Sequence, residues 1–239
     1  MALEFNELYV KLGRNMMFSE VFKAQNDKFQ KIISAASPQV ITAFNKDGSS
    51  LENENFAHMV ISWLEETVSP DNFKQWWLGI ILTQNVEALD FYIAQMLTKV
   101  FTQRPEILNS SEFKIEISEV LQCSSIEEVV FRVAERKVLQ LSYQGLPDII
   151  KYLNENFKLG FDTHMPEFVN VREMFLTRNL IVHNSGRINE VYLQKSKRKD
   201  LKVGAAYPLT EEYVEDGAGE ILKVGHELDE RFTSHFRLT

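Results

Sequence analysis

The amino-acid sequence predicts an all-α protein, and three observations support this fold class. Apolar residues recur at intervals of three and four along most of the 239 residues, which is the period of a helix. No segment sustains the alternation of apolar and polar side chains that marks a half-buried strand. The chain has only 6 prolines and 10 glycines, so long disordered segments are not expected.

The first part of the chain predicts helices separated by one connection. Residues 3–36 have apolar side chains at helical spacing, and helix resumes over residues 51–67. Residues 37–50, which include a proline and an Asp-Gly pair, have the composition of a connecting loop. We therefore expect an N-terminal helical attachment over residues 1–50 and a main helical domain over residues 51–239.

The segment between Ser69 and Pro105 predicts a long central helix. Ser69 can cap it, Pro70 suits the first helical position, and Asp71 favours the positive end of the helix dipole. Pro105 ends it, because the residue before a proline disfavours helical geometry. Apolar residues surround more than one face of this helix, so we expect it to be largely buried.

Shorter helices are predicted after the central one. Residues 115–121 form the first. Ser125, with Glu128 three residues later, has the pattern of a capping box and opens a helix that runs to about Ser142. Another helix follows Pro147.

The C-terminal part predicts two more helices joined by a basic connection. Residues 166–184 form one helix, residues 193–210 form the connection, and residues 210–236 form the last helix. The apolar residues of the last helix have the spacing of a single face: Tyr213, Ile221, Val224, Leu228 and Phe232.

The composition restricts the protein class and its location. A net charge of −8 argues against coating nucleic acid through bulk charge, but a local basic site remains possible because attraction acts within about 10 Å. The single cysteine, Cys123, excludes an intrachain disulfide and suits a reducing cytosol. No apolar run reaches the roughly 20 residues of a membrane helix, and the N-terminus lacks the pattern of a secretory signal. We expect a cytoplasmic protein without membrane association.

No metal or cofactor site is apparent in the sequence. Neither GxxxxGK[ST] nor GxGxxG occurs, so a nucleotide cofactor is not expected. Four of the five histidines show no metal-ligand spacing with Cys123 or with one another: His58, His164, His226 and His235.

The stretch "RNLIVHNSGRINEVYL", residues 178–193, places polar residues in an apolar helix. The apolar stripe expected for this helix contains Phe168, Val171, Phe175 and Val182. At 100° per residue, Arg178 and Asn179 fall in this stripe or at its border, and His183 points the same way as Asn179. We therefore expect these three side chains on the buried face. Left there without partners, each would cost about 1–3 kcal/mol.

The motif resembles the signature of the HEPN superfamily (higher eukaryotes and prokaryotes nucleotide-binding domain). That signature is an arginine, a polar residue, three further residues and a histidine, which Arg178, Asn179 and His183 match. "GRINEVYL" and "VEALDFYIAQMLTKVFTQRPEIL" resemble a bacterial subgroup, and the resemblance extends from about Trp76 to the C-terminus. It implies a HEPN-like antiparallel helical bundle, here with extra N-terminal helices, that forms a homodimer through the motif-bearing helix.

The resemblance also implies a function. Many HEPN proteins are metal-independent ribonucleases of toxin–antitoxin, abortive-infection or other antiviral systems. Others have lost catalysis and bind RNA, nucleotides or partner proteins, and this alternative stays open. An antitoxin or a defence-system protein is the partner that the resemblance implies. Some antitoxin-paired members have a tyrosine two residues after the histidine, where this chain has Ser185.

The residues of the motif suit RNA cleavage without a metal. Imidazole titrates near neutral pH, so His183 can act as acid or base. The guanidinium of Arg178 stays charged and matches two phosphate oxygens. Asn179 can orient His183 or hold a phosphate oxygen. Our hypothesis is that two copies of the motif form one composite cleft at a two-fold interface and cleave single-stranded RNA.

Several residues are expected to support this site. Glu87 and Asp90 are neighbours on the long helix, where they either orient Arg178 or His183 or form an ordinary polar face. Glu173 is a similar but weaker candidate, and Asn184 belongs to the helix end. The basic run after the motif is either an RNA-backbone contact or a solvated loop. It contains Lys195, Lys197, Arg198, Lys199 and Lys202.

Overall fold

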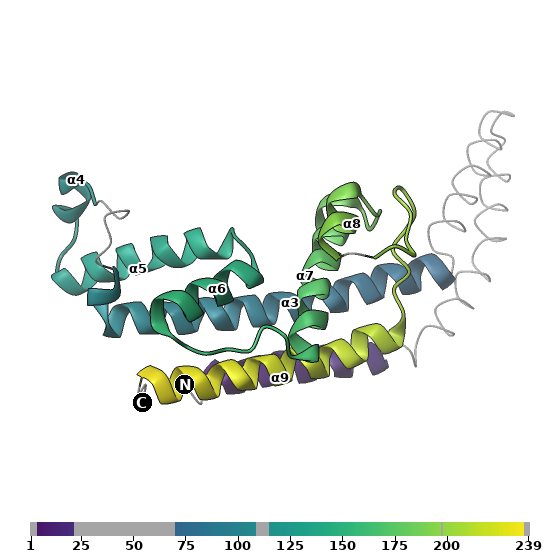
Figure 1. Ribbon diagram of the computed structural model, residues 1–239, viewed down its shortest axis with the longest axis horizontal. Coiled ribbons are helices and arrows are strands. Elements are labelled where there is room, and N and C mark those ends of the chain that lie inside the picture. Colours follow the sequence, from purple (N-terminus) through teal and green to yellow (C-terminus); the bar gives the residue numbers. More distant parts are fainter. Residues whose placement is uncertain (1–3, 22–69, 109–114, 197, 237–239) are drawn as a thin grey trace, which may run out of the picture.

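The computed structural model describes residues 4–21, 70–108, 115–196 and 198–236, and these residues confirm the all-α prediction (Figure 1). They contain no strand, only one isolated bridge between Arg187 and Ala206. After an N-terminal helix of residues 4–21, the elements are α3 (Pro70–Gln103), η1 (Pro105–Leu108), α4 (Ile117–Val120), α5 (Ile126–Ser142), α6 (Leu146–Phe157), α7 (Pro166–Asn184), α8 (Glu190–Ser196) and α9 (Glu211–Phe236). None of these helices is both long enough and apolar enough to span a membrane.

Local sequence signals explain several helix ends. The Ser125 hydroxyl accepts a hydrogen bond from the Glu128 backbone N–H at 3.2 Å, as in a capping box. The Glu128 carboxylate accepts from the backbone N–H of Ser124, so the box closes one residue earlier than its usual pattern. At the end of α7, Ser185 has a φ of 50° and the Gly186 N–H donates to Leu180 O at 2.9 Å.

Helix α3 is the axis of the fold, and α5, α7 and α9 all pack against it (Figure 1). Helix α9 runs in the same direction as α3, because Lys74 contacts Glu211 at one end while Arg104 donates to Phe236 O at the other. The prediction of an antiparallel bundle is therefore wrong for this pair. The reason is that α7, which lies between α3 and α9 in the sequence, crosses both helices. It returns the chain to the end at which α3 starts, so α9 runs in the same direction as α3.

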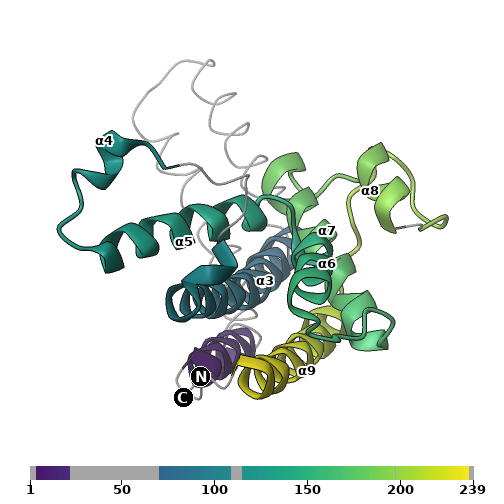
Figure 2. The same cartoon turned by 60° about the vertical axis from the view of Figure 1, so that its left-hand side comes forward.

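The N-terminal helix runs antiparallel to α3 and beside α9 (Figure 2). Its Leu8 and Leu12 are buried in the same core as those two helices. The Asn15 amide donates to Asn85 Oδ1 of α3 at 2.9 Å in this buried interface. The rest of the predicted attachment, residues 22–50, and the predicted helix over residues 51–67 lie outside the described residues, so the boundary at residue 50 stays a prediction.

The burial of α7 differs from the predicted stripe. Its buried residues are Phe168, Val171, Met174, Thr177 and Leu180. Val182 is 47% exposed, Asn179 and His183 are exposed, and Arg178 lies at the border. The prediction that the three motif residues share the buried face is therefore wrong. The reason is that α7 packs on α3 along one side and on α9 along the other, and its buried stripe faces between them.

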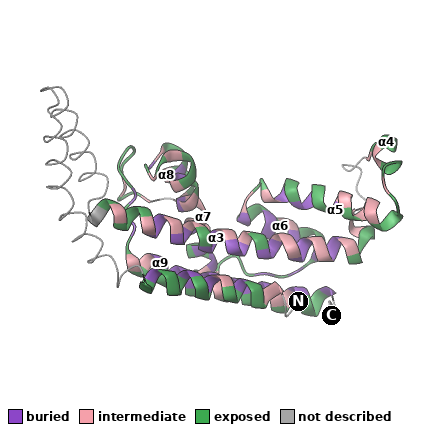
Figure 3. Cartoon of the chain, turned by 180° about the vertical axis from the view of Figure 1, so that it is seen from behind, coloured by how far each residue is buried: buried purple, intermediate pink, exposed green. Residues whose placement is uncertain are grey.

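Buried residues follow the lines along which α3 faces its neighbours, while exposed residues cover the outer sides of the helices (Figure 3). The core includes large side chains of α3 such as Tyr92, Met96 and Phe101. The predicted burial of α3 on several faces is confirmed. As a result, α3 is the central helix against which α5, α7 and α9 pack.

Candidate functional site

A cleft of about 540 Å³ lies above α3, between the α5–α6 turn on one side and helices α7 and α8 on the other. This volume is within the range of ligand-binding pockets. Six of the twelve candidate residues named from the sequence line this cleft: Glu87, Asp90, Arg178, Asn179, His183 and Lys195. They come from three separate helices, so packing of the chain brings them together.

Arg178 is held in the cleft by two hydrogen bonds. Its Nη2 donates to Glu87 Oε1 at 3.0 Å, and its Nη1 donates to Asn179 Oδ1 at 3.2 Å. Glu87 therefore orients Arg178 from the neighbouring helix, which is one of the two roles expected for it. A guanidinium has five N–H donors, so these bonds leave donors for an incoming anion.

His183 is exposed and its imidazole forms no hydrogen bond with the described residues. Asn179 precedes it by one helical turn, but the amide oxygen of Asn179 accepts from Arg178. In this structure Asn179 therefore positions Arg178, not His183. Both ring nitrogens of His183 are therefore open to a ligand in the cleft.

The floor of the cleft carries two carboxylates. Burial raises the pKa of Asp90, an effect that Arg178 opposes and Glu87 reinforces. The Glu87 carboxylate is paired with Arg178 at 3.0 Å. This pairing offsets the negative charge of Glu87, which reduces the repulsion between the floor and a phosphate.

Glu173 does not line the cleft but forms the centre of a separate polar group. We call this group the Glu173 cluster: Glu173, Tyr192, Arg198 and Tyr207. Glu173 Oε1 accepts hydrogen bonds from Tyr192 at 3.0 Å, from Arg198 at 2.9 Å and from Tyr207 at 3.3 Å. Burial raises the pKa of Tyr192. The cluster ties α8 and the following loop to α7, so Glu173 supports one wall of the cleft from behind.

Asn184 also lies away from the cleft. Its side-chain amide donates to the backbone oxygen of Arg187, which closes the turn after α7. This position agrees with the expectation that Asn184 belongs to the helix end. The turn directs the chain into α8, which begins with the Asn189 side chain accepting from the Tyr192 N–H at 2.8 Å.

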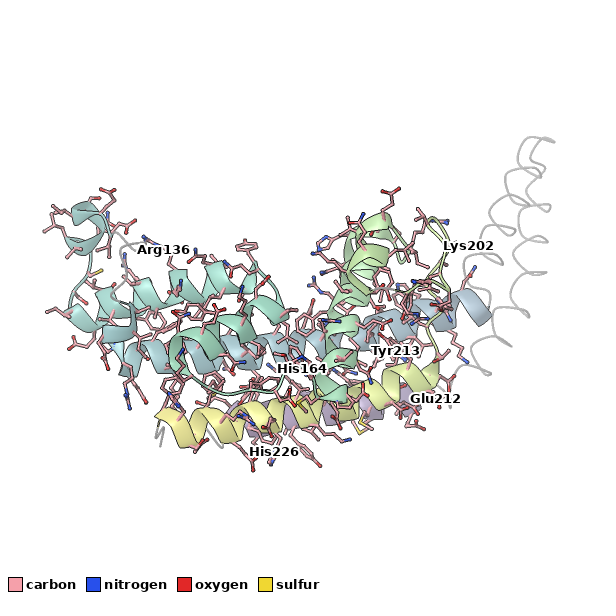
Figure 4. All side chains as sticks on the ribbon, in the orientation of Figure 1. Arg136, His164, Lys202, Glu212, Tyr213 and His226 are labelled. Carbon is pink, nitrogen blue, oxygen red and sulfur yellow. The ribbon has the colours of Figure 1, made fainter. Side chains whose placement is uncertain are left out.

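The structure separates the members of the basic run. Lys195 is exposed and lines the cleft. Arg198 makes two hydrogen bonds of 2.7 Å to Asp200 besides its bond to Glu173, and these bonds hold the pKa of Asp200 at about 2. Lys199 and Lys202 are exposed outside the cleft, and Figure 4 places Lys202 on the loop beyond α8. Lys197 lies outside the described residues.

Two parts of the site were not predicted from the sequence. One is the α5–α6 turn, where Ser142, Tyr143, Gln144 and Gly145 form the wall opposite α7. The other is the N-terminal helix. Its Lys11 and Arg14 line a second hollow of about 450 Å³, which shares Glu87 and Asp90 with the cleft. Neither contribution has a local sequence signal, because both depend on which helices become neighbours.

No family model, no curated protein and no solved structure matches the chain. Among the described residues, no group of three or more histidine, cysteine, aspartate or glutamate side chains is placed to hold a metal ion.

Proposed function

We propose that this protein is a HEPN-type endoribonuclease that cleaves single-stranded RNA in its cleft without a metal ion. The observation that carries the proposal is that Arg178 and His183 line one open cleft together with Lys195. Arg178 can balance charge on the phosphate, His183 can transfer a proton, and Lys195 can contact the RNA backbone. A role in antiviral defence or as a toxin follows from the family resemblance of the motif.

The proposed reaction uses the ribose 2′-hydroxyl as nucleophile. One imidazole removes the proton of this hydroxyl, and the 2′-oxygen attacks the adjacent phosphorus. The bond from phosphorus to the 5′-oxygen breaks, and a protonated imidazole gives its proton to that oxygen. Arg178 balances the charge that develops on the phosphate oxygens. The products are a 2′,3′-cyclic phosphate and a 5′-hydroxyl end.

The reaction needs a base and an acid, and the cleft of one chain has a single histidine. We therefore propose a two-fold dimer in which the histidine of a second copy completes the site. Exposed apolar side chains support such an interface, because Val182 is 47% and Val191 is 57% exposed close to His183. Sedimentation velocity should give the mass of a dimer. A monomer at concentrations that cleave RNA would overturn the shared site.

The decisive experiment measures cleavage of an unstructured, end-labelled RNA in the presence of EDTA. His183→Ala should lower the cleavage rate by about 10²–10⁴-fold, the usual contribution of a general acid or base. His164→Ala is the matched control, because His164 is exposed on a loop outside the cleft. Circular dichroism should show unchanged helix content in both variants. Equal cleavage by His183→Ala and the unchanged protein would exclude His183 as a catalytic residue.

The second candidate is a catalytically inactive HEPN dimer that binds RNA or docks onto a partner protein. The observation that favours it is the 3.0 Å ion pair between Arg178 and Glu87. This pair offsets part of the positive charge that Arg178 would offer to the phosphate during cleavage. The same assay separates the two candidates. RNA that is bound but left intact by the unchanged protein supports the binding module.

A further inference from the structure

The most exposed tyrosine among those whose exposure is given lies on the wall of the cleft. Tyr143 is 84% exposed, compared with 58% for Tyr9 on the N-terminal helix. Its ring forms no hydrogen bond and no ring contact with the described residues. Single exposed apolar side chains are common on protein surfaces. Tyr143 differs from these because it lines a cleft and stands on the wall opposite His183 and Lys195.

The backbone around Tyr143 is firmly held. Its N–H donates to Leu139 O at 3.2 Å, and the Gln144 N–H donates to Leu141 O at 2.9 Å. Leu141 and Leu146, on either side of the turn, are 2% and 0% exposed and anchor it in the core. The sharp change of direction uses a positive φ of 89° at Gly145, which a glycine adopts without strain. The ring is therefore presented from a rigid turn, which lowers the entropy cost of using it for binding.

The two walls differ in a way that fits a nucleotide. The wall of α7 and α8 presents the cations Arg178 and Lys195, which suit a phosphate. The opposite wall presents an aromatic face, which suits a base because every base has a π-face to stack on it. A cleft of about 540 Å³ has room for a phosphate at one wall and a base at the other.

We infer that Tyr143 is the stacking platform for an unpaired base of the bound RNA strand. This inference rests on the proposed function, and it specifies the substrate further. A base can reach Tyr143 only when it is unstacked from its neighbours, so the cleft selects single-stranded RNA over duplex. The stacking tolerates any base, so Tyr143 by itself gives strand selectivity and little sequence preference.

The test uses an RNA analogue that binds but cannot be cleaved. A 2′-fluoro oligonucleotide has no 2′-hydroxyl nucleophile, and one 2-aminopurine in it reports stacking through quenching of its fluorescence. Tyr143→Ala in the full-length chain should weaken binding by about 5–100-fold and abolish the quenching. Tyr143→Phe keeps the ring and should bind and quench like the unchanged protein. Tyr9→Ala is the control for removal of an exposed tyrosine outside the cleft.

The outcomes separate this inference from the ribonuclease proposal. Equal binding and quenching by Tyr143→Ala and the unchanged protein would overturn stacking, whether or not natural RNA is cleaved. If quenching depends on Tyr143 but natural RNA is not cleaved, stacking is supported and the ribonuclease proposal is rejected. Absence of binding to any RNA overturns both, and it would leave the exposed ring as a protein contact.

Discussion

Helix α7 carries two polar groups that differ in how completely they are bonded. On one side, Glu173 accepts three hydrogen bonds through a single oxygen. On the other side, only five residues and about 7.5 Å further along the axis, Arg178 retains free donors and His183 has no hydrogen-bond partner among the described residues. A polar group whose bonding capacity is filled within the protein stabilises the fold. A group whose capacity is open, in a cleft, is available for a ligand.

The comparison is tested most strongly by Arg178→Ala. Because Arg178 is proposed to stabilise charge on the phosphate, cleavage should fall by about 10²–10³-fold. The melting temperature should hardly change, since the ion pair with Glu87 is partly solvent-exposed and such pairs contribute little. End-labelled RNA cleavage and a thermal melt give the two values. A large loss of stability in Arg178→Ala would mean that Arg178 stabilises the fold, as the Glu173 cluster does, and contradict its role in binding.

The opposite result is expected for Glu173→Ala. Removing this carboxylate leaves Tyr192, Tyr207 and Arg198 without their shared acceptor. An unsatisfied buried group costs about 1–3 kcal/mol, so the melting temperature should fall by about 3–10 °C. Differential scanning calorimetry measures this directly. At a temperature where the variant is folded, RNA cleavage should stay within a few-fold of the original rate, and an unchanged melting temperature would contradict the structural role.

A smaller effect should distinguish Lys195 from Arg198 within the basic run. Lys195 lines the cleft, so Lys195→Gln should reduce the slope of log binding constant against log salt by about 0.7, the loss of one phosphate contact on a single strand. Arg198 is bonded to Glu173 and Asp200, so Arg198→Gln should leave the slope unchanged and lower the melting temperature. Fluorescence anisotropy over a salt series measures the slope. Lys202→Gln tests the loop beyond α8 in the same way. If only Lys202→Gln changes the slope, RNA binds along this loop and not in the cleft.

The smallest effect concerns Asp90 and its dependence on pH. Its pKa is raised above the ordinary 3.8, so ionisation costs more in the folded than in the unfolded state. This cost is absent below the ordinary pKa and develops as pH rises through the raised value. Asp90→Asn should therefore increase the melting temperature at pH 7, because the amide removes the cost of ionising a buried carboxyl. Thermal melts near pH 3 should show no gain, and a decrease at pH 7 would mean that the ionised form is favoured.

Features with local causes were predictable from the sequence. Helix α7 begins at Pro166 and ends at Asn184 as expected, because a proline at the start and a left-handed residue after the end act within one turn. The capping serine of α5 was predicted for the same reason. The motif on α7 and the acidic pair on α3 were assigned to one site, and both line the cleft.

Features that depend on packing were not predictable. The buried stripe of α7 centres on Met174 and Thr177 because two helices contact it, whereas periodicity alone favoured Phe175 and Val182. Helix α8 has only seven residues, too few to show a helical period. The α5–α6 turn reaches the cleft only because α5 returns along α3, and no residue of the turn indicates that neighbour.

Because both walls of the cleft stand on α3, the separation between them depends on the register of that single helix. Ile181 of α7 packs against Gly79, whereas Phe157 of α6 contacts Phe101, with ring centroids 6.3 Å apart. These two points are about 33 Å apart along a continuous helix. Deleting one residue between them would shift one wall by about 1.5 Å and rotate it by about 100° relative to the other. Length variation within α3 is thus incompatible with an intact cleft, even where each half of the molecule could still fold.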